Sequence, residues 1–312
     1  MSPEEHAEAR SRAYGLLAGL WTEGLTPSRL EAVRQTPLAA HLPEPLDVDR
    51  LQATHHQAWT LEVLPYAGVF LDTEEGLGGA AQRLLTDCRA AGFSPKTDAS
   101  RSDHIGVALA ALSMLCGAEA DALQDGRTDI ASGIVELQHG ILDRHLLSWL
   151  PPLLVSGRGV VGGFWGEVLE LTAALLLEHR GVAEAAWSPP ELSEGLLEER
   201  KTSLWRIAGV LASPALSGVF LTRADLGGIG RAADVPRGFG ARQQQLANLL
   251  RNAAEYEQLP AIIDQLDVLW KARAEAYAAL SEQHPELAPV TEQWSAQAER
   301  LRALLTRFRA AI

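Results

Sequence analysis

The chain has 312 residues, 47% of them hydrophobic, and a formal net charge of −13. This length is enough for a sizeable core and for two domains. The acidic balance argues against a protein that binds nucleic acid, which needs a basic surface, and it would attract a cationic partner.

The cysteines and the apolar segments indicate a cytoplasmic protein. Cys88 and Cys116 lie far apart and in no metal-like spacing, so no disulfide framework is expected. The N-terminal "MSPEEHAEAR" lacks the basic and apolar regions of a signal peptide. The longest nearly apolar run, Val107 to Ala118, is too short to span a bilayer. We therefore expect no stable membrane insertion.

Helical periodicity dominates, and no stretch shows the sustained alternation of a strand, so the predicted fold is all-α. Thr26 and Pro27 form a good helix start, and Pro151 and Pro152 are expected to end a helix. The expected helices cover residues 4–22, 27–35, 48–63, 76–91, 102–118, 126–147, 160–180, 196–213, 223–233, 240–256, 259–282 and 286–310.

A change of composition divides the chain. Residues 184–195, "EAAWSPPELSEG", are rich in Pro, Ser and Glu and are typical of a linker. We expect a helical bundle in residues 1–183 and a second, smaller helical domain in residues 196–312. Proteases should cut first between Ser188 and Gly195, where regular structure is disfavoured.

Two short motifs have weak functional interpretations. "GRGVVG", residues 157–162, matches the dinucleotide pattern G-x-G-x-x-G, but it follows a helix end rather than a strand, so an interhelical loop is favoured. Glu136 and His139 have the Glu-x-x-His spacing of di-iron bundles. Such a site needs two copies of that motif and two more glutamates. A single copy is typical of a solvated helix face, so no metal site is predicted.

Residues 221–253 allow a helix-turn-helix interpretation. They contain five arginines and two aspartates, and Gln243, Gln244 and Gln245 are candidates for reading bases. The alternative is an ordinary helical hairpin, which the acidic chain favours. The chain has no nucleophile elbow and no cysteine in an evidently electropositive setting. We therefore predict neither an enzyme nor a cofactor, and we keep a DNA-binding regulator as the alternative function.

The stretch "SRSDHIGVALAALSML", residues 100–115, is the most informative. A helix that is apolar on all sides belongs at the centre of a bundle, which we expect for residues 105–116. Ser102 or Asp103 can cap this helix. A functional interpretation is a polar rim on an apolar groove, where Asp103 receives a guanidinium group and His104 adds a hydrogen bond.

Four blocks in order resemble a known family. They are "YAGVFLDTEEGL" (66–77), "SDHIGVALAALSML" (102–115), "RHLLSWLPPLL" (144–154) and "GGFWGEVLELTAALLLEH" (162–179). Their order and spacing resemble the TorD/DmsD/NarJ group of redox-enzyme maturation chaperones over about residues 5–180. The proline-rich, Phe-containing loop usual before the first block is here "QAWTLEVLP", and residues 196–312 extend beyond the family's usual domain.

The resemblance implies an all-helical, non-catalytic cytoplasmic chaperone. It would bind the twin-arginine signal peptide, or the apo form, of a molybdopterin-containing oxidoreductase during cofactor insertion before export. Carried over by position, the partner-binding residues would be Tyr66, Phe70, Leu71, Asp103, His104, His145, Trp149 and Pro151.

Overall fold

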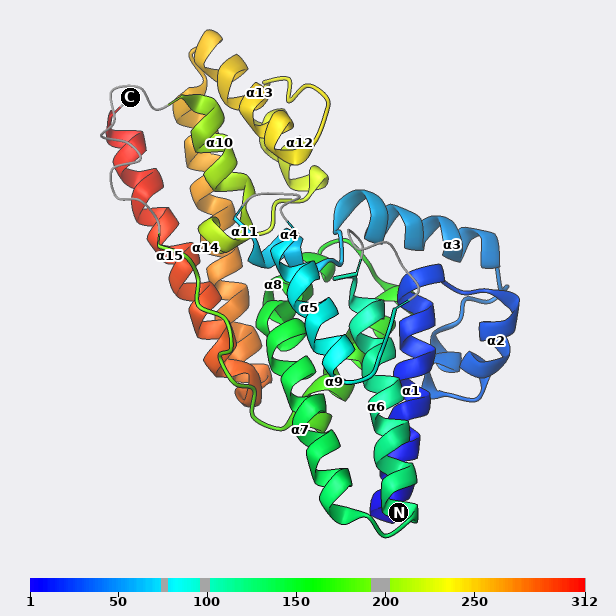
Figure 1. The fold of residues 1–312 in the computed structure, drawn as a ribbon. Helices are drawn as coiled ribbons and strands as arrows, with labels where there is room; N and C mark the ends of the chain where they lie inside the picture. Colours follow the sequence, from blue (N-terminus) through cyan, green and yellow to red (C-terminus); the bar gives the residue numbers. More distant parts are fainter. Residues whose placement is uncertain (74–77, 96–101, 192–202, 312) are drawn as a thin grey trace.

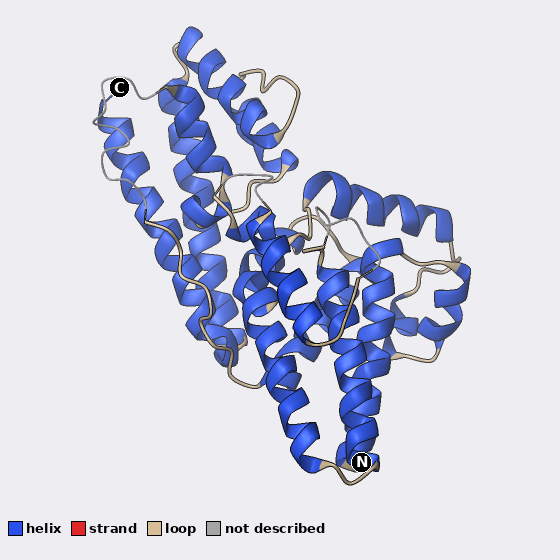
Figure 2. Ribbon diagram, in the orientation of Figure 1, coloured by secondary structure: helices blue, strands red, loops and turns tan. Residues whose placement is uncertain are grey.

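A computed structural model describes residues 1–73, 78–95, 102–191 and 203–311. In these residues all regular elements are helices, so the predicted all-α fold is confirmed (Figure 2). The helices are α1 (Pro3–Glu23), α2 (Pro27–Arg34), η1 (Pro37–His41), α3 (Val48–His56), η2 (Gln57–Glu62), α4 (Ala67–Leu71), α5 (Gly79–Ala90), α6 (Ile105–Gln124), α7 (Thr128–His145), η4 (Leu147–Trp149), α8 (Leu150–Gly157), α9 (Gly163–Arg180), α10 (Leu204–Ala212), α11 (Pro214–Ser217), α12 (Arg223–Ala232), α13 (Arg242–Glu255), α14 (Leu259–Gln283), η6 (Pro285–Leu287) and α15 (Ala288–Ala311).

The prolines of "WLPPLL" begin a helix instead of ending one. Helix α7 already stops at His145, and α8 starts at Leu150 with Pro151 and Pro152 in its first turn. The first turn of a helix has no intrahelical partners for its N–H groups, so proline is accepted there. The sequence prediction was therefore wrong about the role of these two residues.

Helix α6 lies in the middle of the N-terminal bundle, as expected for residues 105–116. It runs beside α1 (Figure 1), and Leu109, Leu112 and Leu115 are at most 2% exposed. The helix extends to Gln124, six residues beyond the expected end. By length and composition α6 could cross a membrane, but 56% of its most apolar window is buried inside the protein, which is also typical of a core helix.

The C-terminal half packs on the N-terminal bundle. Helices α14 and α15 run side by side along one flank, with α10, α12 and α13 at one end (Figure 1). Both α14 and α15 contact α8. The Trp294 indole N–H donates to the carbonyl oxygen of Ser148 at 2.9 Å, and Arg273 Nη1 donates to Val155 O at 3.1 Å. The two halves thus share one buried core.

The described part of the expected linker also makes contacts. Trp187 stacks on Trp294 with ring centroids 4.6 Å apart. Ala183, the residue directly before the expected linker, donates its N–H to Glu286 O at 2.9 Å. Residues 192–195 lie outside the described residues, so the linker at 184–195 and the division into residues 1–183 and 196–312 remain predictions.

Candidate functional site

The first two sequence blocks meet in an isolated antiparallel bridge between Tyr66 and His104. The Ile105 N–H donates to Pro65 O at 2.9 Å, and the Ala67 N–H donates to Asp103 O at 3.0 Å. This bridge joins the start of α4 to the start of α6. Residues that are almost forty positions apart in the chain therefore form one structural unit.

His104, rather than its neighbours, caps α6. Its Nδ1 accepts the N–H of Gly106 at 3.1 Å, which satisfies one of the free donors of the first turn. The imidazole packs edge-on against the Tyr66 ring, with centroids 4.9 Å apart. Because Nδ1 accepts a hydrogen bond, the ring is neutral with its proton on Nε2.

Asp103 serves the neighbouring helix. Its Oδ2 accepts the N–H of Gly68 in α4 at 2.7 Å, and the residue is only 7% exposed. The expectation that Ser102 or Asp103 caps α6 is therefore wrong. The physical reason is the bridge: extended backbone sends successive side chains to opposite sides, so Asp103 faces α4 while His104 faces α6.

A hollow of about 530 Å³, which we call the α1–α6 hollow, opens beside Tyr66 and His104. Its floor consists of small residues of the two helices, and polar and aromatic side chains form its rim. Its lining residues are Gly15, Ala18, Gly19, Thr22, Glu23, Arg29, Tyr66, Phe93, Pro95, His104, Gly106, Val107 and Ala110.

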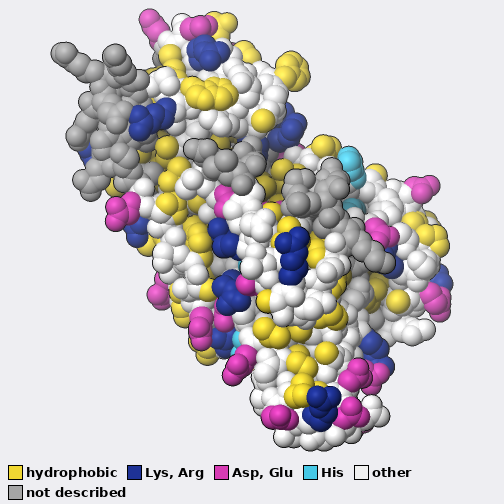
Figure 3. Space-filling model, in the orientation of Figure 1, with side chains coloured by type: hydrophobic (Ala, Val, Ile, Leu, Met, Phe, Trp, Pro, Cys, Tyr) yellow, Lys and Arg dark blue, Asp and Glu magenta, His cyan; other side chains and the backbone are white. Residues whose placement is uncertain are grey.

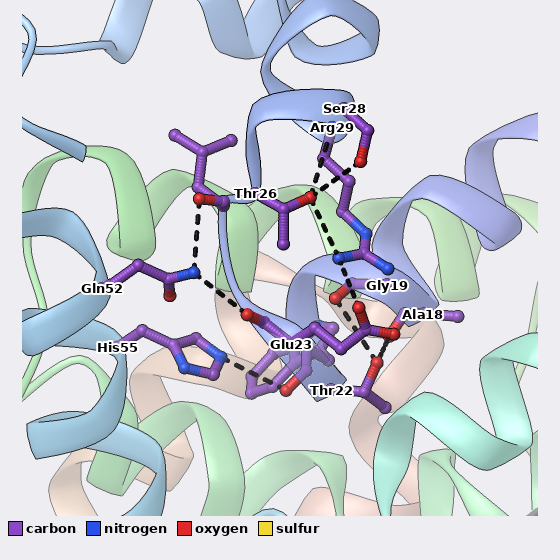
Figure 4. A network of polar contacts seen from close by, with 11 residues as sticks. Ala18, Gly19, Thr22, Glu23, Thr26, Ser28, Arg29, Gln52 and His55 are labelled. Atoms are coloured by element: carbon purple, nitrogen blue, oxygen red, sulfur yellow. Dashed lines mark hydrogen bonds and ion pairs between the residues drawn. The ribbon is translucent and has the colours of Figure 1, made fainter. Parts of the chain in front are cut away.

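Close packing requires the glycines of this floor. A Cβ at Gly106 would lie 2.4 Å from Thr22 Cγ2, and one at Gly19 would lie 2.2 Å from Arg29 Nε. Arg29 thus lies flat on α1, where its guanidinium group forms an ion pair with Glu23 at 3.0 Å (Figure 4). The Glu23 side chain keeps 63% of its exposure, so a carboxylate remains accessible at the rim.

Burial sets the charge states at the bridge. Together with the nearby His55, it lowers the pKa of His104 to about 4. Burial also raises the pKa of Asp103, opposed by the hydrogen bond from Gly68 and assisted by the charge of Asp72. At neutral pH the wall of the α1–α6 hollow therefore presents a neutral imidazole beside the Tyr66 ring.

The aromatic residues assigned by resemblance lie behind this wall. Phe70 in α4 is fully buried and stacks on Trp149, with centroids 5.1 Å apart. On the other side Phe70 stacks on Phe220 of the C-terminal half, also at 5.1 Å. Pro151 is buried in α8. Sequence reasoning missed Phe220, because nothing local indicates which segment covers Phe70.

His145 and Leu71 lie on the side of α4 that faces α5 and α7. His145 is 3% exposed, and its Nε2 donates to Asp87 Oδ2 at 2.7 Å. Burial lowers the pKa of His145, opposed by the Asp87 carboxylate and assisted by the charges of Arg144 and Arg83. Leu71 lines a second hollow, of about 450 Å³, together with Arg83 and Arg144 among others. The eight assigned residues thus surround α4 but do not share one surface.

The alternative motifs find structural roles. Gln245 is 3% exposed and donates to Gly240 O at 2.7 Å, and Gln244 donates to Asn248 at 2.9 Å. Gln243 lines a hollow together with Gly209 of α10. Gln245 is therefore buried within the chain, whereas Gln243 and Gln244 are half-buried.

The remaining motifs are equally ordinary. Glu136 is exposed, and the described residues contain no group of three or more metal-ligating side chains. Residues 157–162 connect α8 to α9, as the interhelical-loop interpretation predicts.

Residues 28–154, less than half of the chain, match the family model described as "Nitrate reductase delta subunit". This match confirms the predicted resemblance to the redox-enzyme maturation chaperones over these residues. No curated protein and no solved structure matches the chain.

Proposed function

We propose that this protein is a non-catalytic cytoplasmic chaperone for a molybdopterin-containing oxidoreductase. It binds the twin-arginine signal segment of the apo enzyme and holds it until the cofactor is inserted. The observation that carries the proposal is the α1–α6 hollow, where Tyr66 and His104 form a wall and Glu23 provides an accessible carboxylate.

The chemistry of the hollow suits such a segment. A twin-arginine signal is cationic and then apolar. Glu23 can receive a guanidinium group in exchange for Arg29, and a charge-assisted bond of this kind is among the stronger ones. The small-residue floor and the Tyr66 ring can take apolar side chains. The net charge of −13 favours the approach of a cation.

The other assigned residues support the wall from behind. Asp103 fixes α4 through Gly68, and Phe70 and Trp149 pack beneath it. We therefore assign Tyr66 and His104 to contact with the client. The remaining six residues, Phe70, Leu71, Asp103, His145, Trp149 and Pro151, act on the client through the position of α4.

Titration calorimetry with a synthetic twin-arginine peptide tests the proposal. Glu23→Gln should weaken binding about ten- to a hundredfold, the value of a lost charge-assisted hydrogen bond. Tyr66→Ala should also weaken binding, and a peptide with both arginines replaced by glutamine should bind weakly to every variant. Glu136→Gln, an exposed carboxylate on α7, is the matched control. Wild-type affinity in Glu23→Gln and Tyr66→Ala would refute the site.

A further inference from the structure

The hairpin of α12 and α13 differs in charge from the rest of the chain. Residues 221–253 contain five arginines and two aspartates, a net charge of +3 in a protein of −13. One of the aspartates, Asp225, is already engaged, because it caps α12 and pairs with Arg273 at 3.2 Å. The hairpin is thus a basic element on an acidic body.

Two guanidinium groups of the hairpin lie over the same glycine. A Cβ at Gly227 would lie 3.2 Å from Arg231 Nη1 and 3.3 Å from Arg237 Nη1. Arg237 also donates to the backbone oxygen of Arg223. Within the described residues, no carboxylate pairs with these three arginines. Neighbouring cations without a counter-charge favour an anionic ligand.

The chain places an exposed phenylalanine, Phe239, two residues after Arg237. Phe239 is 93% exposed, the most exposed of the large hydrophobic side chains in the described residues. It lies between Gly238 and Gly240, which both have positive φ angles of 69° and 119°. The loop is fastened beneath it, since Gln245 donates to Gly240 O at 2.7 Å. The loop therefore presents this ring to solvent.

We propose that the tip of the α12–α13 hairpin, made of Arg231, Arg237 and Phe239, docks peripherally on a bilayer that contains anionic phospholipids. The arginines would contact headgroup phosphates, and the phenyl ring would enter the boundary between headgroups and acyl chains. In Figure 3 the end of the molecule formed by these helices carries basic and hydrophobic side chains, with acidic ones at its extremity. The proposal is independent of client binding.

A membrane fits this surface better than DNA does. Duplex DNA would be held by the arginines, but its grooves are read by polar side chains, and Gln244 and Gln245 of α13 already donate hydrogen bonds within the chain. A fully exposed phenyl ring contributes to binding only when an apolar phase covers it. An anionic bilayer offers both the charge and the apolar phase.

Flotation of the full-length protein with phosphatidylcholine vesicles, with and without phosphatidylglycerol, tests the proposal. We expect binding only to the anionic vesicles, and weaker binding as salt rises. Phe239→Ser should weaken it about tenfold, and Arg231→Gln about fivefold. Both side chains are exposed, so both variants should fold normally.

Two matched controls lie elsewhere on the hairpin. Arg251→Gln removes an exposed arginine from α13, and Tyr256→Ser removes a ring that is 61% exposed at the other end of that helix. Both should bind vesicles like the wild type. Three outcomes would overturn the proposal: no binding to anionic vesicles, equal loss of binding in the controls, or binding to duplex DNA that Arg231→Gln weakens and Phe239→Ser does not.

Discussion

Phe220 stacks on Phe70 with ring planes 28° apart, so a side chain of the C-terminal half covers a residue that the resemblance assigns to partner binding. The segment that carries Phe220 is buried on both sides, with Val219 and Leu221 at 0% exposure. Gly218, directly before it, packs against the backbone of Ala298. In this chain the segment that covers Phe70 of α4 therefore belongs to the C-terminal half of the same protein.

This contact predicts that the halves remain associated after cleavage in the expected linker. After limited proteolysis between Ser188 and Gly195, both fragments should elute together on size exclusion. Phe220→Ala should cost about 3–5 kcal/mol of stability and release the fragments from each other. Phe239→Ala, at an exposed phenylalanine, is the control and should leave them associated. Separate elution of the wild-type fragments would show that the shared core is too weak to join them.

The buried histidines predict a loss of stability in mild acid. Burial lowers the pKa of His179 to about 3 and that of His104 to about 4, both below the ordinary value of 6.5. Below pH 6.5 these two histidines therefore bind protons in the unfolded chain but remain neutral in the folded protein. Stability is fully present above that pH and declines as the pH falls through the folded pKa values of about 4 and about 3. Each such group should cost about 2 kcal/mol by pH 5.

Urea unfolding at pH 7.5 and at pH 5 measures this dependence. His179→Gln is the informative variant, because glutamine can still donate to Gln138 and accept from Tyr14, the partners that His179 has at 3.0 and 2.8 Å. It should unfold with a smaller difference between the two pH values. If the variant and the wild type lose equal stability, this histidine does not contribute to the acid response.

The close packing of α1 against α6 predicts that Gly106 does not tolerate a larger side chain. Alanine there would bring its Cβ to 2.4 Å from Thr22 Cγ2 and 3.0 Å from Ala18 O, so Gly106→Ala should cost about 1–3 kcal/mol. Thr22→Ser removes the methyl group but keeps the hydroxyl bond to Ala18 O. The double variant should therefore recover part of the loss in thermal melts.

Gly133 provides the matched control on α7. A Cβ at this position meets no atom within 4 Å, so Gly133→Ala should leave stability unchanged or raise it by about 0.5–1 kcal/mol. Equal melting temperatures for the variants at the two glycines would contradict the proposed close contact between α1 and α6.

The bond between Asp103 and Gly68 predicts different outcomes for two substitutions. Asp103→Asn keeps an acceptor for the Gly68 N–H and should melt near the wild type. Asp103→Ala loses the acceptor and should cost about 1–3 kcal/mol. If Asp103 acts by positioning Tyr66, the asparagine variant should also retain binding of a twin-arginine peptide, while the alanine variant should bind weakly. Weak binding by both variants would instead show that the charged carboxylate of Asp103 interacts directly with the client.

The sequence predicts the helices well, because their apolar spacing and their start signals are local. Thr26 caps α2 as expected, with its side chain accepting from Arg29 N. The prolines of α8 show the limit of such signals, since proline favours both the end of one helix and the first turn of the next. Which of the two occurs depends on the packing of Trp149 and Leu150, and sequence spacing does not contain that information.

The site was predictable only in part, for a similar reason. The Asp103–His104 pair is visible as an ionisable pair before an apolar helix, but the roles of the two residues depend on a bridge to Tyr66. The buried chain of Tyr14, His179 and Gln138 joins three helices and has no sequence pattern at all. Glu136 is exposed, as the solvated-face interpretation of its Glu-x-x-His spacing predicts.

The stacked indoles of Trp187 and Trp294 have an optical consequence. Two such chromophores 4.6 Å apart and 18° from parallel couple their electronic transitions, so they should contribute a paired signal to the circular dichroism of the protein. The difference between the wild type and Trp187→Phe isolates that signal from the other six tryptophans. The chain thus contains its own spectroscopic reporter of whether the segment around Trp187 is docked on α15.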